Sequence, residues 1–154
     1  MDQQTPTPPR FYPPVLFLAS LVLIGALHYL LPLVRWLDWP WGGVGAVVLT
    51  GGVLVGLWAI GYFRRRDTTI IPFEQSSTLI VDGPYRLSRN PIYLAMVLIL
   101  LGVWLLLGSL SPALVVLLFV RWISTRFIAK EEQHLETQFG RTYLVYKARV
   151  RRWL

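Results

Sequence analysis

The chain contains no cysteine and only 2 histidines. The first absence excludes disulfide bonds and thiolate metal sites, and the second excludes a histidine-rich metal cluster. Charged residues make up only 15% of the 154 residues, whereas hydrophobic residues make up 55%. This balance is too apolar for an ordinary soluble protein of this size. The sequence also lacks a dinucleotide-binding glycine fingerprint, a Walker loop and zinc-ligand spacing, so a nucleotide-like cofactor would not use a soluble dinucleotide fold.

Long apolar segments dominate what is present. Each approaches the roughly 20 residues that a bilayer requires, and none shows the period of two that is typical of barrel strands. Gly52 and Gly56 form a small-xxx-small pair suited to close helix packing. We therefore predict a single-domain, all-α, polytopic membrane protein with four transmembrane helices at about 15–33, 42–63, 91–108 and 112–128. The remaining pieces are a polar tail (1–14), a cytoplasmic loop (64–90) and, over 91–154, a helical hairpin with a C-terminal segment.

Positive charge is distributed unevenly, and the net charge is +7. Lysines and arginines follow the second span, precede the third and follow the fourth, whereas the first connection contains only Arg35. The positive-inside rule then places both termini in the cytoplasm, and we expect a bacterial inner membrane rather than a nucleic-acid partner. The proline-rich tail has no basic region before the first apolar segment, so it does not resemble a cleaved signal peptide.

The two C-terminal spans are joined by residues 108–112, which is short enough to force an antiparallel hairpin. We expect Ser111 to cap the fourth helix and Pro112 to start it. Because residues 121–139 contain no glycine or proline, the fourth helix should continue into the cytosol until Gly140 ends it. An amphipathic segment over 142–153 would follow and lie along the anionic inner leaflet.

Several charged residues lie on this last long helix. At α-helical spacing Arg121 shares one face with Thr125, Ile128 and Glu132. That face is either a polar groove for a charged cofactor or headgroup, or the position from which Arg121 reaches the inner headgroups. Arg126 lies closer to the interface, where the second interpretation is favoured.

Polar residues also gather at the start of the third span. Asn90 and Pro91 suit the N-cap and first turn of a helix, which explains them structurally. Tyr85, Arg89 and Tyr93 surround the same helix start, where free N–H groups favour a carboxylate or phosphate.

The acidic pair Glu131-Glu132 could be an ordinary solvated helix face. It stands in an otherwise basic cytoplasmic surface, however. Carboxylates there can bind an ammonium group or a ribose diol, or balance a sulfonium.

The order of these motifs resembles a known family. Gly83-Pro84-Tyr85 and Arg89-Asn90-Pro91-Ile92-Tyr93 precede the hairpin, and Glu131-Glu132, Phe139-Gly140 and Tyr143-Leu144-Val145-Tyr146 follow it. Over about 78–152 the chain is similar to isoprenylcysteine carboxyl methyltransferases and the related bacterial phospholipid methyltransferases. The resemblance implies an integral membrane methyltransferase that uses S-adenosyl-L-methionine and acts on a lipidic or small hydrophobic acceptor.

The resemblance also implies the residues of the site. Cofactor binding falls on Ser77, Thr78, Leu79, Ile80, Tyr85, Asn90, Pro91, Ile92, Tyr93 and Glu131. Glu132, Tyr93 and Arg126 are the candidate catalytic residues, and Arg121 and Arg126 are the candidate substrate-binding residues. Arg126 lies one position away from a family arginine associated with the substrate. For an amine acceptor, Glu131, Glu132 or Tyr93 would take the proton. For a carboxylate acceptor, Arg121 or Arg126 would orient it.

One departure concerns the acceptor. Eukaryotic carboxyl methyltransferases of this type have histidine where this chain has Asn90, and they are longer. Asparagine can hydrogen-bond a carboxylate but cannot move a proton at neutral pH. A lipid amine or another membrane-dissolved small molecule therefore fits better than a prenylated protein.

Two other functions stay open. An NADPH-dependent membrane reductase of the sterol type has a similar arginine-x-proline-x-tyrosine element, although the acidic pair and the small size argue against it. A non-enzymatic membrane scaffold is the third interpretation, and it would leave Tyr85 and Glu131 without importance.

Overall fold

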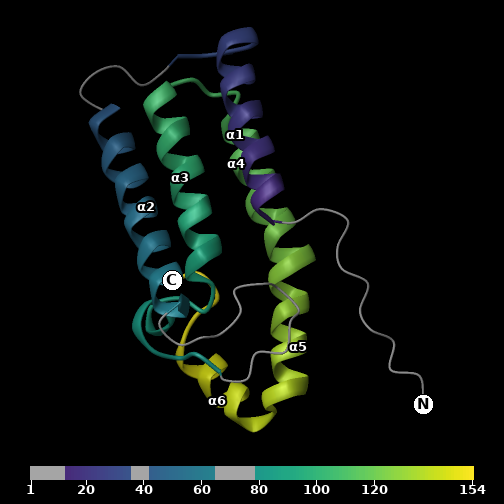
Figure 1. Cartoon of the computed structure of the whole chain (residues 1–154). Coiled ribbons are helices and arrows are strands. Elements are labelled where there is room, and N and C mark those ends of the chain that lie inside the picture. Colours follow the sequence, from purple (N-terminus) through teal and green to yellow (C-terminus); the bar gives the residue numbers. More distant parts are fainter. Residues whose placement is uncertain (1–12, 36–41, 65–78) are drawn as a thin grey trace.

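The structure is a computed structural model that describes residues 13–35, 42–64 and 79–154, without the side chains of residues 63 and 64. Every named element in this part of the chain is a helix, which confirms the all-α prediction (Figure 1). The elements are α1 (Pro13–Leu30), α2 (Gly42–Arg64), the short 3-10 helix η1 (Gly83–Arg86), α3 (Pro91–Leu107), α4 (Ala113–Ile123), the π-helical turn η2 (Ser124–Ile128), α5 (Ala129–Phe139) and α6 (Arg141–Arg149).

The helices form a bundle from which one long rod protrudes. In Figure 1, α3 lies between α2 on one side and the pair of α1 and α4 on the other. The helices α4, η2 and α5 follow one another without a break, so α5 extends beyond the bundle, and α6 turns back at its end. The prediction that the last span continues as a helix to Gly140 is confirmed, because Gly140 (φ 50°) donates its N–H to Glu136 O at 2.9 Å.

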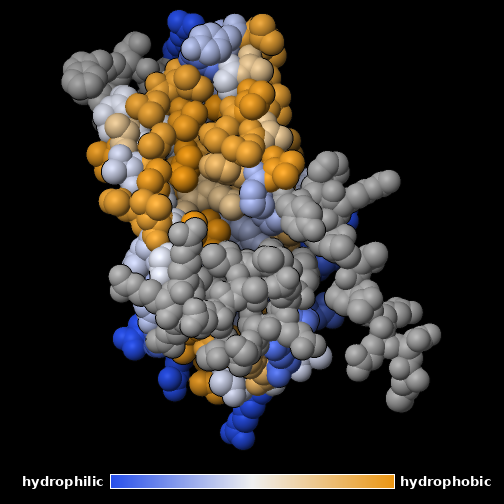
Figure 2. All heavy atoms as spheres, in the orientation of Figure 1, coloured by the Kyte–Doolittle hydropathy of each residue, from blue (hydrophilic) through white to orange (hydrophobic). Residues whose placement is uncertain are grey.

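Two helices, α1 and α2, are long and apolar enough to cross a membrane by length and composition. Helix α3 is equally apolar but has 17 residues, and α4 has 11 before the π turn begins. Figure 2 shows apolar side chains over the bundle and hydrophilic ones at its two ends. The chain is thus a helical protein with two candidate spans, and the third and fourth spans remain predictions.

Glycines bring α2 and α3 into backbone contact. A Cβ atom on Gly52 would lie 2.9 Å from the backbone nitrogen of Ile99, and one on Gly102 would lie 2.5 Å from that of Leu49. A Cβ on Gly56 would meet Ala95 Cβ at 3.2 Å. The predicted packing role of Gly52 and Gly56 is confirmed, and Gly102 serves the same contact from the other helix.

The turn between α3 and α4 is fastened to α1 at the end of the bundle opposite to α5. The fully buried Ser109 lies with its Oγ 2.8 Å from Nδ1 of His28, and its carbonyl accepts a hydrogen bond from Trp104 Nε1 at 2.8 Å. Ser111 donates its hydroxyl to Leu27 O at 3.4 Å. Our prediction that Ser111 caps the fourth helix is therefore wrong, because Pro112 occupies the N-cap position and the Ser111 side chain binds α1.

The π turn η2 changes which residues share a face. Arg121 and Thr125 are exposed, whereas Ile128 and Glu132 are buried, so the predicted common face does not exist. A π turn inserts one residue into the helical repeat and rotates everything after it by about a quarter turn. The hydroxyls of Ser124 and Thr125 bind the carbonyls four residues earlier, at 2.7 and 2.8 Å, in this irregular stretch. This rotation directs Glu132 inward.

Candidate functional site

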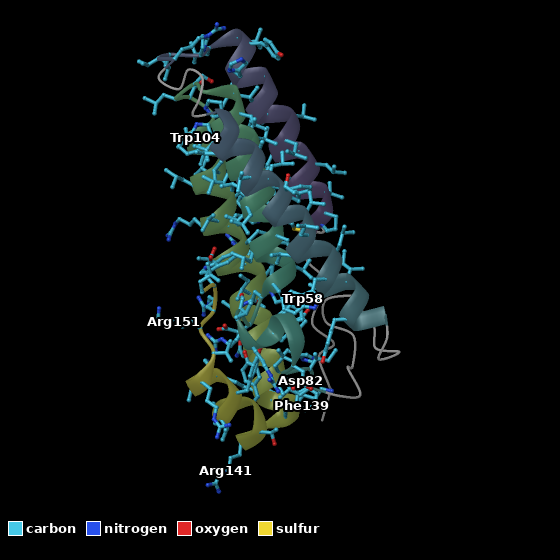
Figure 3. The ribbon with its side chains drawn as sticks, turned by 90° about the vertical axis from the view of Figure 1, so that its left-hand side faces the viewer. Trp58, Asp82, Trp104, Phe139, Arg141 and Arg151 are labelled. Carbon is cyan, nitrogen blue, oxygen red and sulfur yellow. The ribbon has the colours of Figure 1, made fainter. Side chains whose placement is uncertain are left out.

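The site is built where η1 leads into α3. Gly83 has φ 59°, and a Cβ atom there would lie 2.7 Å from the ring of Tyr62 on α2. The backbone thus passes close to α2 at a conformation that glycine adopts without strain. Pro84 and Tyr85 follow and are buried, and the α3 helix begins at the buried Pro91. Figure 3 shows Asp82, just before η1, at the same end of the molecule as Phe139 and Arg141, with Trp104 toward the other end.

Tyr93 and Glu131 form the first contact of the site. The Tyr93 hydroxyl, in the first turn of α3, donates to Oε1 of Glu131, in the first turn of α5, at 2.8 Å. Burial raises the pKa of the Glu131 carboxyl to about 7; the Tyr93 hydrogen bond lowers it and the neighbouring Glu132 raises it. A carboxyl group near this pKa can both hold and release a proton at neutral pH.

Tyr85 adds a second phenol beside the carboxylate. Burial raises its pKa, and the charges of Tyr146 and Glu131 raise it further, so the phenol stays neutral. The Tyr85 carbonyl accepts a 2.7 Å hydrogen bond from the Tyr146 hydroxyl on α6. Tyr85 also packs in an apolar cluster with Ile80, Tyr143 and Tyr146. The last two tyrosines belong to α6, which lies below the bundle.

Glu132 lies in a different environment from its neighbour. Its side chain is only 5% exposed. Oε1 forms an ion pair with Arg89 Nη2 at 3.1 Å and accepts from Arg152 Nε at 3.1 Å, and Oε2 accepts from Arg152 Nη2 at 2.6 Å. This hydrogen bond to Glu132 raises the pKa of Arg152. Glu132 thus joins α5 to the residues before α3 and to the C-terminal segment.

The C-terminal segment crosses the start of α3 and is hydrogen-bonded to it. The backbone N–H of Arg89 donates to Arg151 O at 3.0 Å, and Asn90 Nδ2 and Ser88 Oγ donate to Arg152 O at 3.0 and 3.2 Å. Figure 3 shows Arg151 on this segment beside the bundle. Sequence reasoning missed these contacts, because the partners are more than 60 residues apart and no motif links them. The prediction that Asn90 is the N-cap of α3 and that Pro91 lies in its first turn is confirmed, although the Asn90 side chain makes no cap hydrogen bond.

The remaining candidate residues divide into three groups. Ile80 is buried in the tyrosine cluster and Leu79 packs against it, while Pro91 is buried and Ile92 half-buried at the start of α3. Arg121 and Arg126 are exposed and do not join the site; the Arg126 guanidinium lies 5.9 Å from the ring centre of Trp122. Ser77 and Thr78 lie outside the described residues.

The structure thus places a carboxyl–tyrosine contact at one end of an apolar helical bundle. The family model "Phospholipid methyltransferase" matches residues 41–142. This match covers more than half of the chain, so the chain belongs to the phospholipid methyltransferase family, and that membership indicates a membrane methyltransferase.

Comparison with curated proteins finds one short relative. It is an uncharacterized protein of Haemophilus influenzae, 46% identical over 63 residues, which is 41% of this chain and 100% of the relative. No solved structure matches the chain.

Proposed function

We propose that the protein transfers a methyl group from S-adenosyl-L-methionine to a membrane-dissolved lipidic acceptor at the cytoplasmic face. The observation that carries the proposal is the hydrogen bond between the buried Tyr93 and the half-buried Glu131, at the end of an apolar bundle in a chain of this family. When bound, S-adenosylmethionine supplies an electrophilic methyl group on a positively charged sulfur.

The residues of the site suit such a cofactor. A cationic sulfonium is favoured by a nearby carboxylate and by the faces of aromatic rings, and Glu131, Tyr85 and Tyr93 offer both. Ile80 and Leu79 would supply apolar contact for the rest of the molecule, together with the backbone around Asn90, Pro91 and Ile92. The predicted contributions of Ser77 and Thr78 concern residues outside the described part of the chain.

For an amine acceptor, we assign the proton to Glu131. An amine attacks the methyl carbon only in its neutral form, so a base must remove the ammonium proton first. The Glu131 carboxylate, with a pKa of about 7, is matched to this task at neutral pH. Tyr93 holds the carboxylate in place through the 2.8 Å hydrogen bond. The neutral amine could then accept the methyl group that bound S-adenosylmethionine would supply, with S-adenosylhomocysteine as the leaving product.

Glu132 has a supporting part in this proposal. Both of its oxygens already bind arginine donors, so we assign the catalytic proton to Glu131 rather than to Glu132. Arg121 and Arg126 are exposed on the outer side of the rod, where headgroups of surrounding lipid would meet them. We propose that they contact the headgroup of the lipid acceptor from there.

The orientation is part of the proposal. Most basic residues of the described chain lie at the α5–α6 end, including Arg86, Lys130, Arg141 and Lys147, whereas Arg35 lies at the other end. The positive-inside rule supports a cytoplasmic location for the site and for both termini, in a bacterial inner membrane.

The test is calorimetric titration of the detergent-purified protein with S-adenosylmethionine, S-adenosylhomocysteine and, separately, NADPH. We expect binding of the first two and no binding of NADPH. If only NADPH binds, the protein is a reductase rather than a methyltransferase. If the folded protein binds none of the three ligands, the scaffold interpretation is favoured.

A further inference from the structure

Arg89 is a buried cation whose hydrogen-bonding capacity is only partly used. Its side chain is 9% exposed, and Nη2 lies 3.1 Å from Glu132 Oε1. The other two donor atoms, Nε and Nη1, are buried and have no hydrogen-bond partner among the residues that the structure describes. Buried charged donors without acceptors are unfavourable, because they have lost water and gained nothing in exchange.

The charges around Arg89 leave an excess of positive charge. Glu132 is shared between two arginines, and Arg152 takes both of its oxygens. Two further neighbours are phenols: burial raises the pKa of Tyr143 to about 12, and the charge of Arg89 lowers the pKa values of both Tyr143 and Tyr146. Neutral phenols can accept a hydrogen bond but cannot balance a charge. The group that would accept hydrogen bonds from Nε and Nη1 of Arg89 and balance the excess positive charge is therefore an anion.

A second observation comes from the helix that begins next to Arg89. Helix α3 has 17 residues, and its N-terminus carries free N–H groups and partial positive charge. Asn90 stands at the N-cap, but its side-chain oxygen accepts no cap hydrogen bond from these N–H groups, and its Nδ2 donates to Arg152 O. Both features favour negative charge at the same short stretch of chain.

The location relates Arg89 to the reacting groups. Arg89 contacts Glu132, and the preceding residue on α5, Glu131, contacts Tyr93 in the first turn of α3. Two adjacent residues of α5 thus contact the start of α3 and the segment just before it. A ligand that reacts beside Glu131 therefore lies next to the position on α5 that pairs with Arg89.

We propose that Arg89 and the N-terminus of α3 bind an anionic oxygen group, a carboxylate or a phosphate, of the ligand that reacts beside Glu131. This inference rests on the proposed function, because both proposed reactants carry such a group. S-adenosylmethionine has a carboxylate at its methionine end, and a phospholipid acceptor has a phosphate. The guanidinium fork matches the geometry of either group.

The experiment compares ligand pairs that differ in the anionic group. The first pair is S-adenosylhomocysteine and S-adenosyl-3-thiopropylamine, its decarboxylated analogue. The second pair is a short-chain phosphatidylethanolamine and an alkylamine without phosphate. Affinities are measured by calorimetry in detergent for the wild type, for Arg89→Lys and for Arg152→Lys. Each variant keeps a positive charge opposite Glu132, so Arg152→Lys is the matched control on the other side of the same carboxylate.

We expect Arg89→Lys to weaken binding of the anionic member of one pair by about tenfold or more, as for a lost charge-assisted hydrogen bond. The affinity for the other member of that pair should change by less than about twofold. Arg152→Lys should change the affinities for the two members of the pair to the same extent. The pair that responds identifies the source of the anion: the first pair indicates the cofactor carboxylate and the second the lipid phosphate.

Equal weakening of both members in both pairs, or no weakening at all, would overturn the proposal and leave Arg89 a structural residue. Should Arg89→Lys fail to fold, the wild type decides, because equal affinity for both members of each pair would overturn it as well. A wild type that binds no S-adenosylhomocysteine contradicts the proposed function, and the phosphatidylethanolamine pair then still decides the role of Arg89.

Discussion

Glu131 and Glu132 are adjacent in the sequence but lie in two opposite electrostatic environments. Glu131 is half-buried beside phenols and accepts its hydrogen bond from the Tyr93 hydroxyl, whereas Glu132 is held between the guanidinium groups of Arg89 and Arg152. The first environment disfavours the charged carboxylate and raises the pKa of Glu131 to about 7. The second supplies Glu132 with opposite charge on two sides. The two carboxylates therefore differ in chemistry, one suited to proton transfer and the other to holding the structure together.

Replacing Glu131 should change how stability depends on pH. The pKa of Glu131 rises from 4.5 to about 7 on folding, so between these values the unfolded chain releases a proton that the folded protein retains. Stability from this group is present below pH 4.5 and falls by about 1.4 kcal/mol per pH unit as the pH rises toward 7. In Glu131→Gln this dependence should disappear. The measurement is thermal unfolding in detergent from pH 4.5 to 8, and parallel curves for the two proteins would contradict the assignment.

The Tyr93 hydroxyl should set the pH at which the enzyme becomes active. Its hydrogen bond lowers the pKa of Glu131, which burial raises, so Tyr93→Phe should raise this pKa further. If Glu131 is the base, the rising limb of methyl transfer against pH lies near pH 7 in the wild type and moves to higher pH in the variant. The check is the rate of S-adenosylhomocysteine production from pH 5.5 to 9. An unmoved limb with lower turnover would mean that Tyr93 acts only in binding.

Removing the charge of Glu132 should cost far more stability than removing an exposed acid. Glu132→Gln leaves two arginines facing each other without their shared carboxylate, and we expect a loss of about 3–5 kcal/mol. The control is Glu136→Gln, which breaks a half-exposed pair with Lys147 and should cost less than about 1 kcal/mol. Denaturant titration of both variants in detergent tests this. Similar losses would show that the Arg89–Glu132–Arg152 contacts contribute little to the fold.

Two neighbouring glycines on α2 should respond in opposite ways to alanine. A Cβ at Gly52 would lie 2.9 Å from the backbone nitrogen of Ile99, whereas one at Gly51 would meet nothing within 4 Å. Gly52→Ala should push α2 away from α3 and destabilise the protein by about 1–3 kcal/mol. Gly51→Ala should be neutral or slightly stabilising, because alanine favours the helix. Melting temperatures of both variants provide the comparison, and equal values would contradict the close packing.

The sequence predicted the helices well because their determinants are local. Apolar length defined α1 and α2, the proline at 91 and the glycine at 108 marked the ends of α3, and the lack of glycine and proline over 121–139 predicted the long rod. It also placed Tyr93 and Glu131 at the same end of the bundle. Their hydrogen bond spans 38 residues of sequence, so only the packed fold shows it.

What the sequence did not predict depends on irregular or long-range structure. The π turn over 124–128 has no distinctive pattern, yet it determines that Glu132 points inward and Arg121 outward. The hydrogen bonds from Ser88 and Asn90 to Arg152 involve a basic C-terminal stretch that reads as surface charge. Propensity and spacing carry no information about such partners.

The central claim is methyl transfer that depends on Glu131. The most direct test incubates proteoliposomes, made from bacterial lipid extract, with S-adenosylmethionine labelled in its methyl group, and then measures the label in the lipid fraction. We predict labelled lipid with the wild type, strongly reduced label with Glu131→Gln, and full label with Gly51→Ala as a folded control. Absence of label with the folded wild type, or equal label with Glu131→Gln, would contradict the account.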